Sequence, residues 1–174
     1  MPLIEVNGKN PQIPSSTWVA ENATVTGDVV FGEDCSVWFQ VVIRGDVNKI
    51  RIGDKVNIQD ASIVHGTNGR GDTIIGNNVS IGHRAIIHGC QIEDNVLVGM
   101  GAIILDEAVI ESNVIVAAGA VVTSGSRLKS GYLYAGIPAK QVKPLAQEMI
   151  DYFIKGTAAA YVEYSGYYTD KPNK

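Results

Sequence analysis

The chain has three histidines, His65, His83 and His88, and all of them fall within a stretch of 24 residues. Neutral imidazole is the most common side-chain ligand of zinc and related transition metals. A single histidine on a soluble protein is usually a surface or turn residue. Whether these three act together therefore depends on the elements that position them.

Bulky aliphatic or aromatic residues recur with a period of six over most of the chain. They are Val19, Val25, Phe31, Val37 and Ile43, then Ile52, Ile58 and Val64, then Ile75, Ile81 and Ile87, and finally Ile92, Val98, Ile104, Ile110, Val116, Val122, Leu128 and Tyr134. A smaller residue follows most of them four positions later, and Gly, Asp, Asn and Glu crowd the positions between. This period is typical of a short strand plus a corner. Three such sides close a coil of about eighteen residues, and coils stack about 4.8 Å apart.

Two insertions interrupt the period, one around residues 46–48 and one within residues 66–72. An insertion in a stack of coils must bulge outward, so each is expected to form a loop at an edge.

Once the insertions are removed, the histidines fall into columns that cross the stacked coils. Arg44, His65 and His88 share one outward column, and Asp60 lies beneath His83 on the neighbouring face. Imidazoles from adjacent coils can converge on one ion with bonds of about 2.0–2.1 Å. His83 stands before a corner, so its side chain diverges from the pair within one chain. Three parallel prisms around a threefold axis would bring His83 of one subunit to the pair of the next, which predicts a homotrimer with three interfacial metal sites.

Four segments that carry these residues resemble the gamma-class carbonic anhydrases and their bacterial relatives. They are Arg44-Gly45-Asp46, Asn57-Ile58-Gln59-Asp60, Ile63-Val64-His65 and Gly82-His83-Arg84-Ala85-Ile86-Ile87-His88-Gly89-Cys90. The repeat from Val19 to Val142 also resembles the hexapeptide-repeat β-helices, which coil left-handed. The resemblance implies an all-β solenoid, a left-handed parallel β-helix of hexapeptide repeats with a C-terminal α-helix.

This resemblance implies a metal centre and the residues around it. His65, His83 and His88 would hold zinc, with Fe(II) or Co as alternatives, and Arg44 and Asp46 would form an ion pair between subunits of the trimer. The implied activity is a lyase reaction, the reversible hydration of carbon dioxide to bicarbonate by a metal-bound hydroxide at the trimer interface.

Four further residues receive roles from the same resemblance. Gln59 and Asn57 would orient metal-bound water or carbon dioxide, and Asp60 would set the tautomer of His83. Tyr161 resembles a tyrosine that relatives place near the metal, although packing of the C-terminal helix explains it equally well.

The sequence departs from the family pattern at two places. Val47 stands where the best-known members have a glutamate. Those members have another glutamate in a long loop, whereas here the loop from Gly66 to Asp72 is short and has no glutamate. Those glutamates are associated with proton exit, so turnover is expected to be slow, absent or dependent on another group.

Other functions stay open. Tyr134-Ala135-Gly136-Ile137-Pro138-Ala139-Lys140 resembles the closing turn of hexapeptide-class enzymes, so an acyl-CoA-linked acyltransferase or thioesterase is an alternative. A non-catalytic metal-binding assembly subunit is another.

Composition narrows the partners and the location. The net charge of -4 leaves no basic face for phosphates, so neither nucleic acid nor membrane is expected as a partner. The segment Met1–Val6 does not read as a secretory signal, which favours a cytoplasmic protein. Cys35 and Cys90 occupy repeat positions and are interpreted as packing residues.

Two regions are expected. Residues 1–142 would form the β-helix, with an extended N-terminal lead-in, and residues 143–174 a C-terminal helix and tail packed on the coils. A helix is expected from Pro144 to Lys155, with a second one from Ala158 to Tyr164, whereas residues 166–174 are expected to fray.

Overall fold

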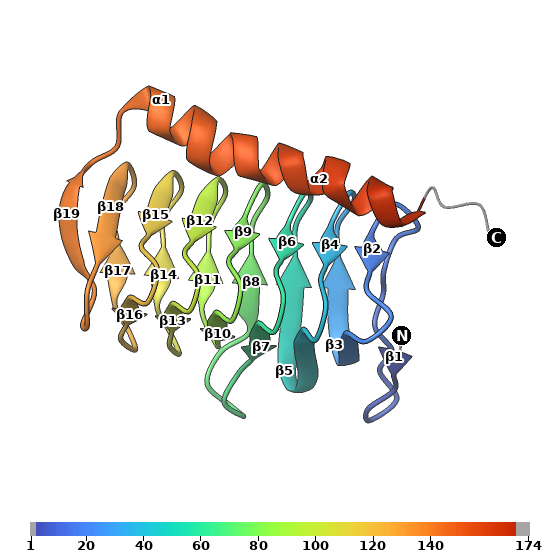
Figure 1. The fold of residues 1–174 in the computed structure, drawn as a ribbon. Helices are drawn as coiled ribbons and strands as arrows, with labels where there is room; N and C mark the ends of the chain where they lie inside the picture. The colour runs from blue at the N-terminus through green and yellow to red at the C-terminus, as the bar shows by residue number, and fades with distance from the viewer. Residues whose placement is uncertain (1–2, 170–174) are drawn as a thin grey trace.

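The computed structural model describes residues 3–169, which form a left-handed parallel β-helix with a single C-terminal helix (Figure 1). The N-terminal strands are β1 (Leu3–Ile4), β2 (Trp18–Val19), β3 (Thr24–Phe31), β4 (Ser36–Val37), β5 (Val42–Ile52), β6 (Asn57–Ile58), β7 (Ile63–His65), β8 (Thr73–Ile75), β9 (Ser80–Ile81) and β10 (Ile86–His88). The C-terminal strands are β11 (Gln91–Ile92), β12 (Val96–Val98), β13 (Ile103–Ile104), β14 (Val109–Ile110), β15 (Val114–Val116), β16 (Val121–Val122), β17 (Arg127–Leu128), β18 (Tyr132–Ala135) and β19 (Lys140–Pro144).

The strands make three faces, as the six-residue period predicted. One sheet contains β4, β6, β9, β12, β15 and β18 in parallel register. The other two faces join through β3 and β5, which are long enough to continue from one face to the next. The expectation of a loop around Asp46 is wrong, because this insertion lies in the continuous strand β5. The longer insertion forms the loop between β7 and β8, as expected.

The bulky column fills the interior of the coils. Ile43, Ile58, Ile81, Ile87 and Ile104 are completely buried. Small residues such as Ala85 and Ala102 are also completely buried and leave room for the larger side chains. Burial of one such isoleucine stabilises the fold by about 1.5–3 kcal/mol, so the repeated column is the main source of its stability.

The register across the coils agrees with the predicted columns. His88 pairs with His65, and Ile43 pairs with Val64. On the next face Ile58 pairs with Ile81, which puts Asp60 and His83 at equivalent positions two residues later. The corners that follow the histidines turn through positive φ angles of 60° at Arg84 and 52° at Gly89.

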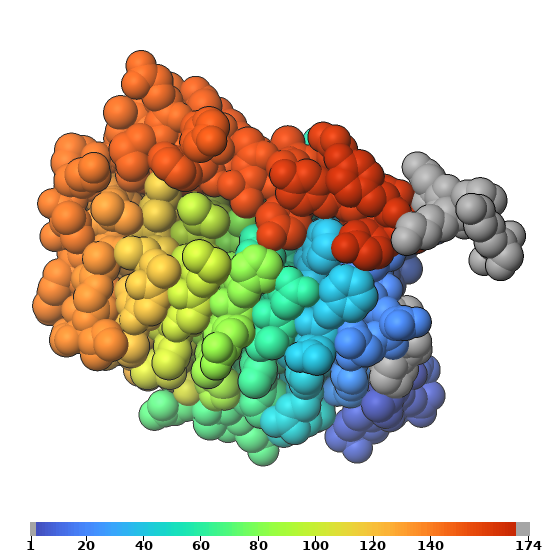
Figure 2. Space-filling model, viewed as in Figure 1, coloured from blue at the N-terminus to red at the C-terminus, as the bar shows by residue number. Residues whose placement is uncertain are grey.

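The C-terminal helix is continuous from Gln147 to Thr169. It consists of α1 (Gln147–Met149), a π-helical segment η1 (Ile150–Lys155) and α2 (Gly156–Thr169), and it runs back along the coils toward β2 (Figure 1). In the space-filling view it covers the coils over most of their length (Figure 2). Ile150 and Ile154 pack against Ile115, so an apolar side of the helix is buried on the sheet.

The structure corrects three details of the expected helices. The two expected helices are one continuous helix from Gln147 to Thr169. Pro144 ends β19, which pairs antiparallel with β18, and the helix begins only at Gln147. The expected fraying from Gly166 is wrong as far as Thr169, because Tyr168 packs on the rings of Trp18 and Trp38. Residues 170–174 lie outside the described residues. The division after residue 142 falls within β19 and stays an expectation.

The N-terminal lead-in and the cysteines belong to the same packed structure. β1 pairs in parallel with β3, so the lead-in joins the edge of the first coils. Burial raises the pKa of the Cys35 thiol to about 11 and that of Cys90 to about 12, which keeps both thiols protonated at neutral pH. Within residues 3–169, no helix has the length and apolar character to span a bilayer.

Candidate metal centre

His65 and His88 form a pair on adjacent coils. Each follows a buried residue, Val64 or Ile87, at the end of a three-residue strand, so its side chain points outward. The centroids of the two rings are 5.4 Å apart and the ring planes make an angle of 67°. Two imidazoles at this separation can reach a common ion after small rotations of their side chains.

His88 is fixed by a carboxylate from the following coil. Its Nδ1 lies 2.9 Å from Oδ1 of Asp106, and the Thr67 hydroxyl donates to Oδ2 of Asp106 over 3.0 Å. Partial burial alone would raise the pKa of Asp106. The hydrogen bonds from the Thr67 and His88 side chains outweigh burial and hold this pKa below its ordinary value. An ionised Asp106 favours the tautomer with hydrogen on Nδ1, which leaves Nε2 of His88 as a free electron-pair donor.

His83 has the same kind of partner on the other face. Its Nδ1 lies 2.7 Å from Oδ2 of Asp60, which is the contact that the column assignment predicted. Its backbone N–H donates to Oε1 of Gln59 over 3.2 Å. Nε2 of His83 is therefore also left for another ligand.

Gln59 and Asn57 are buried beneath this histidine. The Gln59 amide donates to Oδ1 of Asn57 over 3.0 Å, and the Asn57 amide donates to the Ser80 hydroxyl over 2.8 Å. This chain of bonds holds the backbone of His83 from below. The predicted role of both residues in orienting substrate stays a prediction, since each amide already has partners inside the protein.

His65 is held differently. Its Nε2 lies 3.0 Å from Oδ1 of Asp46 and 3.1 Å from Nη2 of Arg44. Arg44 and Asp46 also pair with each other at 3.1 Å within the one chain. Their predicted role between subunits stays a prediction, and Nε2 of His65 would have to exchange these contacts for a metal.

The three histidines do not converge within one chain. His65 and His88 lie on one sheet and His83 follows a strand of the other. The described part of the chain places no three His, Cys, Asp or Glu side chains around a common point. The donor set nevertheless fits a divalent transition metal, because two of the imidazoles have Nδ1 on a carboxylate and Nε2 available.

Tyr161 lies in α2, on the same side of the molecule as Asp60. Its ring packs edge-on against Trp38, with centroids 5.2 Å apart, and against Tyr164 at 5.5 Å. Burial, and secondarily the negative charge of Asp60, raises the pKa of Tyr161, so the phenol is protonated at neutral pH. Tyr161 thus has the packing role that the sequence suggested, and its role near a metal stays a prediction.

The sequence analysis missed Asp106 and Thr67. Asp106 follows His88 by eighteen residues, which is one coil, so the column argument that identified Asp60 could also have identified it. Thr67 lies in an insertion, where the repeat predicts no partner.

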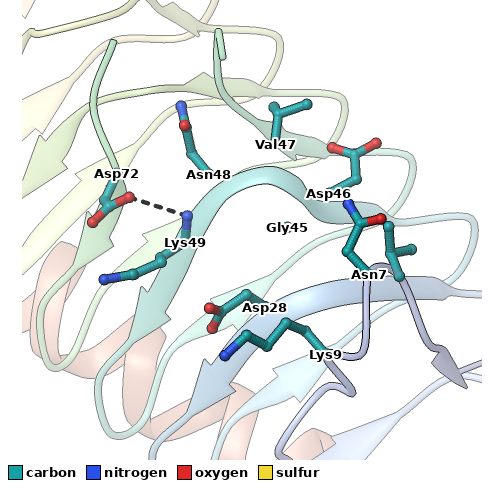
Figure 3. Close-up of a pocket in the computed structure, with 10 residues that line it drawn as sticks. Asn7, Lys9, Asp28, Gly45, Asp46, Val47, Asn48, Lys49 and Asp72 are labelled. Carbon is teal, nitrogen blue, oxygen red and sulfur yellow. Dashed lines mark hydrogen bonds between the residues drawn. The ribbon is translucent and has the colours of Figure 1, made fainter. Parts of the chain in front are cut away.

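A cavity of about 340 Å³ lies beside the part of β5 that contains Asp46 (Figure 3). Residues of the β5 bend line it together with Lys9 and Asp28, and the backbone N–H of Lys49 donates to Asp72 across it over 3.0 Å. None of the three histidines lines this cavity, so it is separate from the candidate metal ligands.

Comparisons with known proteins agree with the six-residue repeat. Residues 72–104 and 89–124 match the family model of the bacterial transferase hexapeptide (six repeats). The chain is 42% identical to gamma carbonic anhydrase 2, mitochondrial, of Arabidopsis thaliana over 99% of this chain, although it spans only 63% of that relative. It is 43% identical to the carbonic anhydrase of Geobacillus kaustophilus over 92% of this chain and 87% of that protein. The crystal structure of a hexapeptide transferase family protein from Anaplasma phagocytophilum has a TM-score of 0.91 and 42% identity, with 95% of this chain and 97% of that one covered. The chain therefore belongs to the gamma carbonic anhydrase family of hexapeptide-repeat β-helices.

Proposed function

We propose that the protein is a lyase that catalyses the reversible hydration of carbon dioxide to bicarbonate at a metal site shared between the subunits of a homotrimer. One observation carries this proposal: His88 and His83 each present a free Nε2 with Nδ1 on a carboxylate, but on faces that one chain cannot bring together. A second chain is needed to combine them. Relatives that are named carbonic anhydrases support the reaction.

The histidines would hold the ion, and the surrounding residues would fix their orientation. Zinc is the first candidate, with Fe(II) or Co as alternatives, since three imidazoles do not select between them. When bound, such an ion supplies a Lewis acid that lowers the pKa of water toward about 7. Asp106 and Asp60 orient two of the imidazoles through Nδ1, and the Gln59–Asn57 chain supports His83.

Proton removal is the step for which the chain has the fewest candidates. Val47, at 42% exposure, contributes no titratable group beside Asp46. The loop between β7 and β8 uses Thr67 to bind Asp106 and contains no glutamate. We therefore expect turnover to depend more strongly on buffer concentration than it would with a built-in proton acceptor.

The metal and the reaction can be tested directly. Metal analysis of the purified protein should find one divalent ion per chain. Stopped-flow carbon dioxide hydration, after loading with zinc and after anaerobic loading with Fe(II), should show activity that a chelator removes. A wild-type trimer that binds the ion but gives no hydration in any buffer would favour the non-catalytic assembly subunit instead.

The shared site has its own test. His83→Ala and His65→Ala trimers should each lack bound metal. Random mixing of the two kinds of subunit should restore about one quarter of the sites, because each intact site needs one subunit of each kind in a fixed order. A site within one chain would recover nothing, and that result would contradict the proposal.

An acyl-CoA-linked activity is the second candidate. It is favoured by the similarity to a solved hexapeptide transferase family protein. A screen of acyl-CoA thioesters, with hydrolysis and transfer followed separately, distinguishes it. Turnover of a thioester that survives complete removal of metal would favour a transferase and count against the carbonic anhydrase proposal.

A further inference from the structure

We propose that Asp106 is a positioning residue for His88, and that Thr67 in the loop between β7 and β8 is built to hold it in place. This inference rests on the proposed metal site. It gives the loop between β7 and β8 a function, which is to fix the orientation of a metal ligand through Asp106.

The contacts of Asp106 leave its carboxylate little freedom. Oδ1 accepts from Nδ1 of His88 at 2.9 Å and lies 3.4 Å from the backbone N of Thr67, and Oδ2 accepts from the Thr67 hydroxyl at 3.0 Å. Asp106 is 8% exposed, although it carries a charge. Both oxygens of this carboxylate accept hydrogen bonds, and the side chain has little contact with solvent. Thr67 therefore restricts the rotation of the carboxylate, which in turn fixes the orientation of the His88 ring.

The backbone next to His88 leaves space for this carboxylate. A side chain at Gly89 would clash with Oδ1 of Asp106, and Gly89 adopts a φ of 52° that other residues rarely adopt. The Glu107 N–H donates to the Gly89 carbonyl over 2.7 Å, so the two coils are joined beside the carboxylate. Glycine at position 89 is therefore a condition for the His88–Asp106 contact.

The other histidine partners are more exposed. His83 and Asp60 have 42% and 40% of their side-chain surfaces exposed, against 26% and 11% for His88 and Asp106. Since water screens an exposed contact more strongly, the contact with Asp106 sets the orientation of His88 more firmly than the contact with Asp60 sets that of His83. The orientation of His88 is thus fixed by Asp106, whereas His65 must exchange its contacts with Asp46 and Arg44 for a metal.

Substitutions at Asp106 and Thr67 test the proposal through metal affinity. Zinc affinity is measured by competition with a chromophoric chelator, and cobalt loading adds a visible absorption spectrum that reports ligand geometry. Asp106→Ala should weaken zinc binding by about 10- to 100-fold. Thr67→Val should weaken it by roughly two- to tenfold, because it removes one hydrogen bond to the carboxylate. Asp106→Asn should recover part of the loss, since its amide oxygen can still accept from Nδ1.

Asp94→Ala is the matched control. Asp94 also joins two coils through its carboxylate, which accepts the backbone N–H of Asn77 over 2.7 Å, but it contacts no histidine. This variant should lower the thermal unfolding temperature and leave zinc affinity unchanged. If Asp106→Ala and Thr67→Val both keep zinc affinity within about twofold of the wild type, the inference is overturned.

A second readout needs no metal. Nitrogen-15 NMR of the metal-free protein should show His88 with its hydrogen on Nδ1, and Asp106→Ala should give a mixture of tautomers. A wild-type His88 with its hydrogen on Nε2 would also overturn the inference. The outcomes separate the two proposals: loss of metal in His88→Ala but not in Asp106→Ala rejects this inference alone, whereas unchanged binding in His88→Ala rejects the proposed metal site. If Asp106→Ala fails to fold, Asp106→Asn and Thr67→Val decide.

Discussion

The coils around β5 to β10 and the coils from β11 to β17 have the same interior and different surfaces. Ile87 in the first group and Ile110 in the second are both completely buried. The first group has both insertions and all three histidines, each beside a carboxylate, whereas the coils of β11 to β17 have neither an insertion nor a histidine. Inward residues therefore specify the coil, and outward residues with insertions can be changed without altering it.

The largest difference should appear in metal binding. His88→Ala should abolish binding of one ion per site, because the remaining imidazoles of the site cannot complete the ligand set. Thr123→Ala is the control, since Thr123 follows Val122 in the same column two coils further on. Metal content after dialysis measures both. Retention of a full complement of metal in His88→Ala would remove the distinction between the two groups of coils.

The interior should respond equally in both groups. Ile87→Ala and Ile110→Ala each leave a cavity in the completely buried column, so each should lower the free energy of unfolding by about 2–5 kcal/mol. Denaturant unfolding of the metal-free protein at fixed concentration measures this. Only Ile87→Ala should also weaken metal binding, because it adjoins His88. A much smaller loss at one of the two positions would show that the interiors are not equivalent.

The glycines at the corners allow a finer comparison. Gly89 and Gly119 both have positive φ angles, of 52° and 68°, so the backbone conformation alone should cost an alanine about 1–2 kcal/mol at either position. A side chain at Gly119 has open space around it, whereas one at Gly89 would displace Asp106. Gly89→Ala should therefore lower metal affinity as well as stability, and Gly119→Ala only stability. Equal metal affinities in the two variants would argue against the space-making role of Gly89.

The smallest effect is expected at Glu111, in the regular coils. The backbone N–H of Ser130 and then the side chain of Arg127 hold the pKa of Glu111 below its usual value. A lowered pKa in the folded state gives stability that is present above the unfolded pKa and lost as pH falls through the folded pKa. Glu111→Gln should thus lower the unfolding temperature slightly at pH 7, and this difference should shrink in acid. Thermal unfolding of both proteins between pH 7 and pH 3 measures this difference in unfolding temperature. A difference that grew toward acid would contradict the prediction.

Most of the fold was predictable from the sequence because the same six-residue pattern of inward residues recurs in every coil. Each coil repeats the same inward positions, so the register that pairs His88 with His65 follows from counting residues. The same counting predicted the contact between Asp60 and His83. The left-handed direction came from the resemblance and not from the period, since parallel crossovers are ordinarily right-handed.

Contacts through loops and rotamers were not predictable. Thr67 reaches Asp106 across 39 positions from an insertion that the repeat does not describe. The choice of Asp46 and Arg44 as partners of Nε2 in His65 depends on side-chain rotamers. The helix continues past Gly166, a poor helix former, because aromatic rings on the first coils hold Tyr168.

The long C-terminal helix has a consequence for how the molecule comes apart. A stack of coils with contacts only between neighbours can lose its end coils one at a time, as a zipper opens. Here η1 contacts β12, while α2 contacts β4 and β6, and Tyr168 reaches Trp18 near the start of the chain. Opening of the first coil must therefore release the helix from its aromatic contacts there. The C-terminal helix therefore makes unfolding of the N-terminal coils more cooperative and protects them from fraying.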